Sequence, residues 1–348
     1  MSRGASVIVA GAGALGLSAA LSLADAGCSV TVRDPGDRGR ASAVAAGMLA
    51  PVFEAALDAE TAGGLDLLLA ARNLWPAVAA RAGVMLDRSG TAAVGSQAWL
   101  ADIRARLARL GLRGSDLPRS LLDELARGLA PDLQGLLLRE DWRLEPRPAL
   151  KALRRAAEAA GVGFADEAVL ARGAADWLVI ATGADQSLAE VAPELTALTP
   201  IKGQILNFAD VRGGRVSLRG EGCYAVPGPD GLAVGATMEP GVADTRPDMA
   251  ALAPLVTAVG RMFPGLAEAT FGMSAGVRAA TADGLPMVGL SRAPGVILAV
   301  GARRNGWLLA PLVAEIVTAC AMGRDAGPYA ARLDPGRFGP GRFGGRAA

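Results

Sequence analysis

One short segment near the N-terminus, Gly11-Ala-Gly-Ala-Leu-Gly16, restricts the fold more than any other part of the sequence. It directly follows the apolar run Ser6–Ala10 and opens a helix-forming stretch, Leu15–Ala26. A second apolar run, Ser29–Arg33, comes next. A strand, a glycine turn, a helix and a strand within about 30 residues are the βαβ unit of a Rossmann-like nucleotide-binding domain.

The three glycines of this segment each have a physical reason to be there. In such loops the first glycine permits a tight turn, the second lets the backbone approach a pyrophosphate, and the third lets helix and strand pack closely. We assign these roles to Gly11, Gly13 and Gly16. Asp34 ends the second strand, where an acid accepts a hydrogen bond from a ribose hydroxyl. An acid there disfavours the 2′-phosphate of NADP, but it does not separate NAD from FAD.

The chain contains no histidine. This excludes a Ser-His-Asp triad, a Cys-His pair, histidine-ligated metals and imidazole acid–base chemistry. The three cysteines, Cys28, Cys223 and Cys320, are far apart and form no CxxC pair, so we expect neither a disulfide framework nor a metal site.

Charge and hydropathy restrict the partners and the location. The net charge of +1 gives no reason to expect binding to nucleic acid or to an anionic membrane. No uninterrupted apolar run reaches the roughly 20 residues that span a bilayer. The N-terminal apolar run is broken by glycines, unlike the core of a signal peptide. We therefore expect a soluble, cytoplasmic protein.

The rest of the chain alternates between helical and strand-like stretches. Residues 56–134 are expected to be helical, with Pro76 kinking or splitting the first helix. The expected helices are 65–81, 97–110, 118–129, 148–160, 249–262 and 307–322. Buried-type strands are expected at 177–181 and 296–300, and an antiparallel sheet from 201–208, 215–219, 223–226 and 232–236.

Six motifs, in order, resemble one known family. The first, in Ser42–Pro51, contains the run AAGMLAP. The others are Pro200-Ile-Lys-Gly-Gln204, Cys223-Tyr-Ala-Val-Pro227, Val234-Gly-Ala-Thr-Met238, Gly276-Val-Arg278 with Asp283-Gly-Leu-Pro286, and Arg304-Asn-Gly-Trp-Leu-Leu-Ala-Pro311. The sequence resembles the FAD-dependent glycine oxidases of thiamine biosynthesis, within the D-amino-acid oxidase and sarcosine oxidase group. The resemblance covers nearly the whole chain.

Two positions depart from that family's pattern. Its members commonly carry a histidine in a G-H-F-R-N-G run, where this chain has Ala302 and Arg303. A histidine also often precedes the tyrosine of the substrate strand, where Gly222 or Cys223 stands. These departures concern the substrate and the reaction with oxygen rather than the flavin site.

The resemblance implies an α/β fold in which a discontinuous, Rossmann-like FAD-binding domain of the glutathione-reductase and D-amino-acid-oxidase type is interleaved with an α+β substrate domain built on an antiparallel sheet. We expect the FAD-binding domain to comprise residues 1–55, 142–198 and 272–333. The substrate domain would comprise residues 56–141 and 199–271. Residues 334–348 would form a flexible tail.

The resemblance also implies non-covalent FAD and specific site residues. Arg278 would pair with the substrate carboxylate, Tyr224 would add a hydrogen bond, and Met238 and Arg304 would line the pocket. No residue is expected to act as an acid or base, because a hydride passes from the substrate Cα to flavin N5. The expected cofactor contacts are Gly11, Gly13, Ala14, Leu15, Gly16, Asp34, Arg40, Ser42, Ala46, Gly47, Met48, Val169, Gly183, Arg304, Asn305, Gly306, Trp307 and Leu308.

The implied reaction is oxidation of glycine or a similarly small amino acid to an imine. The imine then gives a keto acid and ammonia, with hydrogen peroxide formed from oxygen. An FAD-dependent amine or D-amino-acid dehydrogenase with another electron acceptor, an NAD-dependent dehydrogenase and an FAD-binding protein without activity remain alternatives. Assembly into a homo-oligomer is left open.

Overall fold

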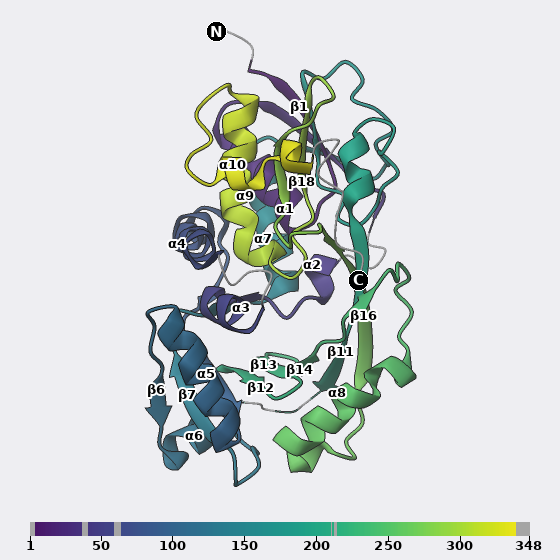
Figure 1. Cartoon of the computed structure of the whole chain (residues 1–348). Helices are drawn as coiled ribbons and strands as arrows, with labels where there is room; N and C mark the ends of the chain where they lie inside the picture. Colours follow the sequence, from purple (N-terminus) through teal and green to yellow (C-terminus); the bar gives the residue numbers. More distant parts are fainter. Residues whose placement is uncertain (1–3, 37–40, 59–63, 210, 212–213, 339–348) are drawn as a thin grey trace.

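The computed structural model describes residues 4–36, 41–58, 64–209, 211 and 214–338, and its N-terminal strand lies inside a six-stranded sheet (Figure 1). Neighbouring strands of this sheet are parallel, except that the edge strand β17 is antiparallel to β18. The order is β17 (Met287–Leu290), β18 (Val296–Val300), β10 (Trp177–Ile180), β1 (Ser6–Ala10), β2 (Ser29–Arg33) and β9 (Gly163–Ala165). Continuous apolar strands suit this position, because helices and loops bury both faces of a parallel sheet.

Four helices pack together beside this sheet: α1 (Ala14–Asp25), α4 (Leu65–Ala82), α7 (Pro146–Ala159) and α9 (Gly306–Ala321). The pair formed by α1 and α9 is held by apolar packing and by a hydrogen bond of 2.7 Å between the hydroxyls of Ser22 and Thr318. Trp75 of α4 is fully buried, and its indole N–H donates to the carbonyl oxygen of Trp307 at 3.0 Å. The start of α9 is therefore fixed from its buried side.

A second, larger sheet occupies the lower part of the molecule in Figure 1. All of its strand pairs are antiparallel except β12 with β5. The order is β15 (Glu239–Pro240), β11 (Thr199–Ala209), β14 (Gly231–Gly235), β13 (Tyr224–Gly228), β12 (Ser217–Gly220), β5 (Thr91–Gly95), β7 (Gln134–Leu138) and β6 (Ser115–Leu117), and β16 (Gly272–Ala280) also pairs with β11. Three further helices pack on this sheet: α5 (Gln97–Arg109), α6 (Arg119–Leu125) and α8 (Met249–Met262).

Short elements join the two parts. The helices α2 (Ala41–Val44) and α3 (Pro51–Leu57) lie between them (Figure 1). The strand β3 (Met48–Leu49), which lies between these two helices in the sequence, forms a three-stranded sheet with β8 (Trp142–Leu144) and β4 (Leu86–Asp87). The remaining elements are α10 (Ala330–Leu333) and the 3₁₀ helices η2 (Pro193–Ala197), η3 (Pro264–Leu266) and η4 (Pro335–Phe338).

Several expected elements differ from the structure. Pro76 does not split its helix: α4 is one continuous helix, and Trp75 and Ala79 bury its inner face on both sides of the proline. The helix expected to reach residue 129 ends at Leu125. The region 56–134, in which we expected several helices, also contains β5 between two of them. This strand is rich in alanine and glycine, and all five of its residues are buried.

The two sheets draw on separate stretches of sequence. Strands of the six-stranded sheet come from residues 6–33, 163–180 and 287–300, and those of the large sheet from 91–138 and 199–280. The strand β16, which we assigned to the FAD-binding domain, pairs with β11 of the large sheet along its whole length. Its long antiparallel ladder with β11 determines where it lies.

The start of the expected tail packs against the six-stranded sheet. The 3₁₀ helix η4 lies beside β17, and the Arg337 guanidinium donates to Asp283 at 2.7 Å. Residues 339–348 lie outside the described part.

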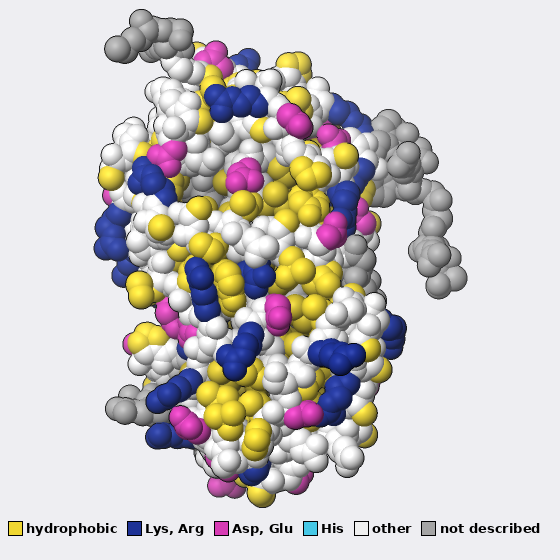
Figure 2. Space-filling model, turned by 90° about the vertical axis from the view of Figure 1, so that its left-hand side faces the viewer, with side chains coloured by type: hydrophobic (Ala, Val, Ile, Leu, Met, Phe, Trp, Pro, Cys, Tyr) yellow, Lys and Arg dark blue, Asp and Glu magenta, His cyan; other side chains and the backbone are white. Residues whose placement is uncertain are grey.

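The molecular surface shows no single-signed field on the face drawn in Figure 2. Basic and acidic side chains are intermingled there, in keeping with the net charge of +1. Within the described ranges, none of the helices combines the length and the apolar character needed to cross a membrane.

Candidate active site

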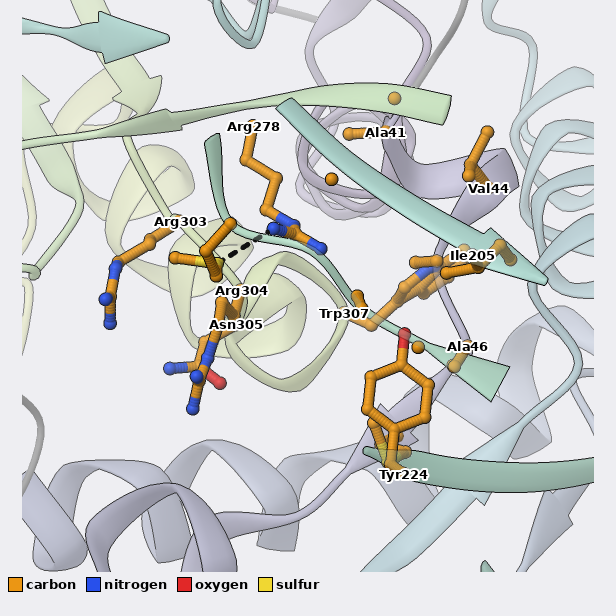
Figure 3. Close-up of a pocket in the computed structure, with 18 of the residues that line it drawn as sticks. Ala41, Val44, Ala46, Ile205, Tyr224, Arg278, Arg303, Arg304, Asn305 and Trp307 are labelled. Carbon is orange, nitrogen blue, oxygen red and sulfur yellow. Dashed lines mark hydrogen bonds between the residues drawn. The ribbon is translucent and has the colours of Figure 1, made fainter. Parts of the chain in front are cut away.

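A cavity of about 300 Å³ opens between the segment from α2 to β3 and the large sheet (Figure 3). Its walls come from α2 and β3, from strands β11 to β14 and β16, and from the loop that precedes α9. Eleven expected site residues line it: Ser42, Ala46, Gly47, Met48, Tyr224, Met238, Arg278, Arg304, Asn305, Gly306 and Trp307. The fold thus brings together residues that are more than 250 positions apart in the chain.

The glycine loop adopts the tight turn that the sequence indicates. Gly11 has φ of 104°, and a Cβ on it would lie 2.5 Å from the carbonyl oxygen of Ala181. A Cβ on Gly16 would overlap the carbonyl oxygen of Gly11. Asp34 braces this turn from the end of β2, because its carboxylate accepts hydrogen bonds from the backbone N–H groups of Ala12 at 2.6 Å and Gly36 at 2.9 Å.

Ser42 connects the glycine loop to the cavity. Its hydroxyl accepts a hydrogen bond from the backbone N–H of Ala14, in the first turn of α1, at 3.1 Å. Its carbonyl oxygen accepts one from the indole N–H of Trp307 at 3.0 Å. Ser42 therefore holds the starts of α1 and α9 close to each other. Arg40, which we expected beside a pyrophosphate, lies outside the described residues.

The first turn of α9 faces the cavity. Asn305 precedes the helix without a side-chain hydrogen bond to it, and Gly306 and Trp307 line the cavity. The first N–H groups of a helix have no partner within the helix, and the helix dipole makes this end attractive to negative charge. Leu308 belongs to the same turn, but its side chain packs in the core.

Small residues let the backbone approach the cavity from the other side. Gly47 has φ of 73°, and a Cβ on it would overlap the carbonyl oxygen of Leu144. A Cβ on Gly276 would lie 3.2 Å from the Cα of Ala41. Two expected cofactor residues lie elsewhere: Val169 is buried in an apolar cluster beside β1 and β10, and Gly183 follows β10.

Arg278 reaches into the cavity from β16, and Tyr224 points toward the same space from β13 (Figure 3). The Nη1 atom of Arg278 lies 3.0 Å from the sulfur of Met238 and 3.3 Å from the carbonyl oxygen of Thr237. No described carboxylate forms an ion pair with Arg278. Burial lowers the pKa of this guanidinium, and the neighbouring Tyr224 acts in the opposite direction. Burial also disfavours the charged form of Tyr224, and it therefore raises the pKa of the Tyr224 hydroxyl.

Glu54 of α3 is a site residue that the sequence did not reveal. Its side chain is 5% exposed, and one carboxylate oxygen accepts a hydrogen bond from Nη2 of Arg219 at 2.7 Å. The other oxygen accepts from Nε and Nη2 of Arg304 at 3.0 and 2.5 Å. Burial acts to raise the pKa of Glu54, but Arg304 and Arg219 together bring that pKa below its ordinary value.

This arrangement gives Arg304 a structural contact. Arg304, which we expected to contact substrate or cofactor, lines the cavity, and its forked end is directed at Glu54 and, at 3.5 Å, at Asp58. Arg303, which follows Ala302 at the position of the absent family histidine, also lines the cavity and pairs with Asp58. Both arginines therefore fasten the loop before α9 to the region of α3.

Asp141 fixes α3 itself. This fully buried carboxylate accepts hydrogen bonds from the backbone N–H groups of Val52 at 2.9 Å and Phe53 at 3.1 Å, in the first turn of the helix. Burial raises the pKa of Asp141 to about 7, although both hydrogen bonds act to lower it. Neither Asp141 nor Arg219 stands in a local sequence pattern that distinguishes it from a surface residue.

The described residues fit a dinucleotide with a flavin at one end. Glycines occupy positions where a Cβ would collide with backbone, and the first turns of α1 and α9 lie on either side of Ser42. At the other end of the same cavity stands an arginine with no carboxylate partner among the described residues. The fold and this site together define a nucleotide-dependent oxidoreductase.

Comparison with known proteins narrows this class to one family. The chain belongs to the FAD dependent oxidoreductase family, whose model matches residues 6–320. It is therefore an FAD-dependent oxidoreductase, as the six motifs indicate.

Three relatives show how far the similarity extends. The chain is 28% identical to a glycine oxidase of Bacillus licheniformis, over 91% of this chain and 92% of that protein. It is also 28% identical to a bifunctional ThiO/ThiG protein of Trichormus variabilis, over 95% of this chain but only 55% of that protein. The chain thus spans about half the length of this bifunctional relative. The crystal structure of a glycine oxidase from Geobacillus kaustophilus has a TM-score of 0.79 at 23% identity, covering 95% of this chain and 98% of that one, and shares the fold.

Proposed function

We propose that this protein is an oxidase of small amino acids, of the class represented by glycine. The observation that carries the proposal is the half-buried guanidinium of Arg278, which lines the cavity without a carboxylate partner among the described residues. A charge that is partly removed from water is costly unless it is paired. A substrate carboxylate supplies the missing partner, and the glycine oxidase relative supports this choice.

The proposal places the cofactor between the glycine loop and the start of α9. Gly11, Gly13 and Gly16 would hold the pyrophosphate with the first turn of α1 and with Ser42. Asp34 would accept a hydrogen bond from a ribose hydroxyl in addition to those from the backbone of the loop. The backbone at Ala46, Gly47 and Met48 and the first turn of α9, from Gly306 to Leu308, would border the flavin ring. Bound FAD supplies the two-electron acceptor for a hydride from the carbon that bears the amine.

The substrate is small, so its carboxylate is its main handle. Arg278 would bind this carboxylate through two parallel hydrogen bonds, and the Tyr224 hydroxyl would add a third. Met238, whose sulfur lies 3.0 Å from Arg278, would limit the position of the guanidinium. These side chains orient the Cα–H bond, and orientation alone accounts for a large share of the rate in such reactions. No side chain of the cavity needs to act as a base if the amine binds unprotonated.

The overall reaction removes two electrons and two protons from the amino acid and gives an imine. Water then converts the imine to a keto acid and ammonia, and oxygen takes the two electrons and two protons to form hydrogen peroxide. A role in thiamine biosynthesis, which the resemblance implies, is part of this proposal. Growth of a thiamine-requiring, glycine-oxidase-deficient bacterium on expression of this chain tests that role.

A dehydrogenase that passes the electrons to another acceptor is the second candidate. The observation in its favour is the loop before α9, where Ala302 and Arg303 replace the family's histidine region and Arg303 pairs with Asp58. Oxygen uptake and dye reduction, measured in parallel with glycine, sarcosine, D-alanine and D-proline, decide between the two. Uptake of oxygen with formation of peroxide supports the oxidase. Turnover with dye alone supports the dehydrogenase, and turnover with neither contradicts both.

A further inference from the structure

We propose that the cavity takes amino acids that carry a second carboxylate, and that Arg219 binds this second group. The proposal rests on the proposed function, because it names the class of amino acid that the same site prefers. It places Arg278 on one carboxylate and Arg219 on the other.

The register of the large sheet directs Arg219 into the cavity. Arg219 of β12 is paired with Tyr224 of β13, Tyr224 with Gly235 of β14, and Gly235 with Ile205 of β11. Directly paired residues in neighbouring strands point to the same face of a sheet. All four line the cavity. Arg219 therefore ends a row of residues that forms the floor of the cavity.

Arg278 enters from the opposite end of this floor. It belongs to β16, which pairs with β11 on the side away from β14. Four strand spacings, about 19 Å, separate the backbones of β16 and β12. The arginine side chains shorten this gap: the Arg219 guanidinium lies 5.6 Å from the centre of the Tyr224 ring, and Arg278 interacts electrostatically with the same tyrosine. A short dicarboxylate suits the remaining space.

The charge on Arg219 is only partly compensated. Arg219 is 9% exposed, and its Nη2 atom donates to Glu54, but its Nε atom is buried with no hydrogen-bond partner among the described residues. Arg219 shares Glu54 with Arg304, which donates two hydrogen bonds to it and also lies 3.5 Å from Asp58. A second carboxylate on the substrate would give Arg219 a partner of its own.

Backbone rather than side chains forms the wall beside Arg219. Gly220 and Gly222 both line the cavity, and a Cβ on either would point toward Met262 or Ala258 of α8. Gly222 or Cys223 stands where a histidine often precedes the tyrosine in the resembling family. A substrate with hydrogen alone on its Cα, such as glycine, would leave this part of the cavity and Arg219 without a contact.

The test compares kcat/KM for glycine with that for D-aspartate, D-glutamate and iminodiacetate, in the FAD-loaded protein. The variants are Arg219→Gln, which removes the charge, and Arg219→Lys, which keeps the charge but not the fork. Arg215→Gln is the matched control, because Arg215 precedes the same strand but its side chain is 73% exposed. FAD content and thermal unfolding are measured for each variant. Arg304 still pairs with Glu54 after either change at Arg219.

We expect the wild type to prefer at least one dicarboxylate over glycine by about tenfold or more. Arg219→Gln should reduce that preference by about 10- to 100-fold, mainly through KM, whereas Arg215→Gln leaves it unchanged and Arg219→Lys retains part of it. A wild type that prefers glycine overturns the proposal. An Arg219→Gln variant with normal FAD content and an unchanged preference also overturns it. If Arg219→Gln does not retain FAD, the preference for a dicarboxylate over glycine is compared between Arg219→Lys and the wild type. An unchanged preference in Arg219→Lys then overturns the proposal.

A binding measurement separates this proposal from the proposed function. Malonate, succinate and acetate are titrated into the oxidised, FAD-loaded protein, and binding is followed through the flavin absorption. Even if no amine is oxidised, so that the proposed function fails, succinate or malonate should bind about tenfold or more tightly than acetate. Arg219→Gln should abolish this difference. Equal binding of acetate and the dicarboxylates by the wild type contradicts the second anion site.

Discussion

The guanidinium of Arg278 lies over the backbone of Gly203, where any Cβ would overlap its nitrogen atoms. The two residues belong to adjacent antiparallel strands, in which Gly203 is paired with Gly276 and Arg278 with Ile201. The arginine side chain therefore leans along the sheet, across its neighbour strand, and ends beside Met238. A glycine at position 203 sets where the proposed carboxylate site lies.

Gly203→Ala should displace the Arg278 guanidinium. A misplacement of about 1 Å in a binding group costs on the order of 100-fold in rate, so we expect kcat/KM for amino acids to fall by roughly 10- to 100-fold. FAD content should stay normal. Gly272→Ala is the control, because a Cβ there would meet nothing closer than 3.8 Å. Equal kinetics for both variants would show that Gly203 does not position Arg278.

Arg278→Ala should remove the ion pair that binds the substrate carboxylate. Truncating one partner of a buried charge pair costs about 2–5 kcal/mol, so kcat/KM for amino acids should fall roughly 30-fold to several thousand-fold. Arg278→Lys should recover only part of the loss, because a point charge cannot reproduce a two-pronged contact. For amines without a carboxylate, kcat/KM should fall little. A uniform loss for amines with and without a carboxylate would contradict the assigned role.

Asp34→Ala should weaken FAD binding. The change removes the hydrogen bonds that the carboxylate accepts from Ala12 and Gly36, and with them the brace on the glycine loop. The expected loss in binding free energy is about 1–3 kcal/mol, measured from the equilibrium release of fluorescent FAD. Asp25→Ala is the control, because it also removes one negative charge but lies at the surface in a pair with Arg81. Equal FAD affinity in both variants would mean that Asp34 does not support the cofactor site.

Asp141 should make stability depend on pH. Burial raises the pKa of Asp141 from 3.8 to about 7 in the folded protein, so folding favours the protonated form. The stability that this group contributes is complete below pH 3.8 and is lost as the pH rises through about 7. Urea unfolding at several pH values should show the wild type losing stability relative to Asp141→Asn across this range. A constant difference between the two proteins would contradict the raised pKa.

The βαβ unit and the position of Arg278 in the wall of the cavity could be predicted from the sequence. The turn needs Gly11 for its positive φ and Gly16 for close packing. Because no other residue type meets these two requirements as well as glycine, the motif can be recognised in the sequence. The buried strand β18 and the helix α8 were also predicted with their observed bounds. β18 is a continuous run of large apolar residues, and α8 has apolar residues at helical spacing.

The rest of the site depends on tertiary contacts that leave little trace in the sequence. Glu54 meets Arg219 and Arg304 across 165 and 250 residues of chain, and no local pattern distinguishes a buried glutamate from a surface one. The strand β5 was missed because its sequence, Thr-Ala-Ala-Val-Gly, is both fully buried and rich in alanine and glycine, which are uncommon in strands.

Anaerobic mixing of the FAD-loaded protein with small amino acids tests the central claim most directly. The measurement follows the visible flavin absorption after addition of glycine, sarcosine, D-alanine, D-proline, D-aspartate or iminodiacetate, with dithionite as the control for a reducible flavin. If the protein oxidises small amino acids, at least one of them should bleach the flavin of the wild type, and the same compound should bleach the Arg278→Ala protein far more slowly. A flavin that dithionite reduces but that no amino acid bleaches would contradict the account.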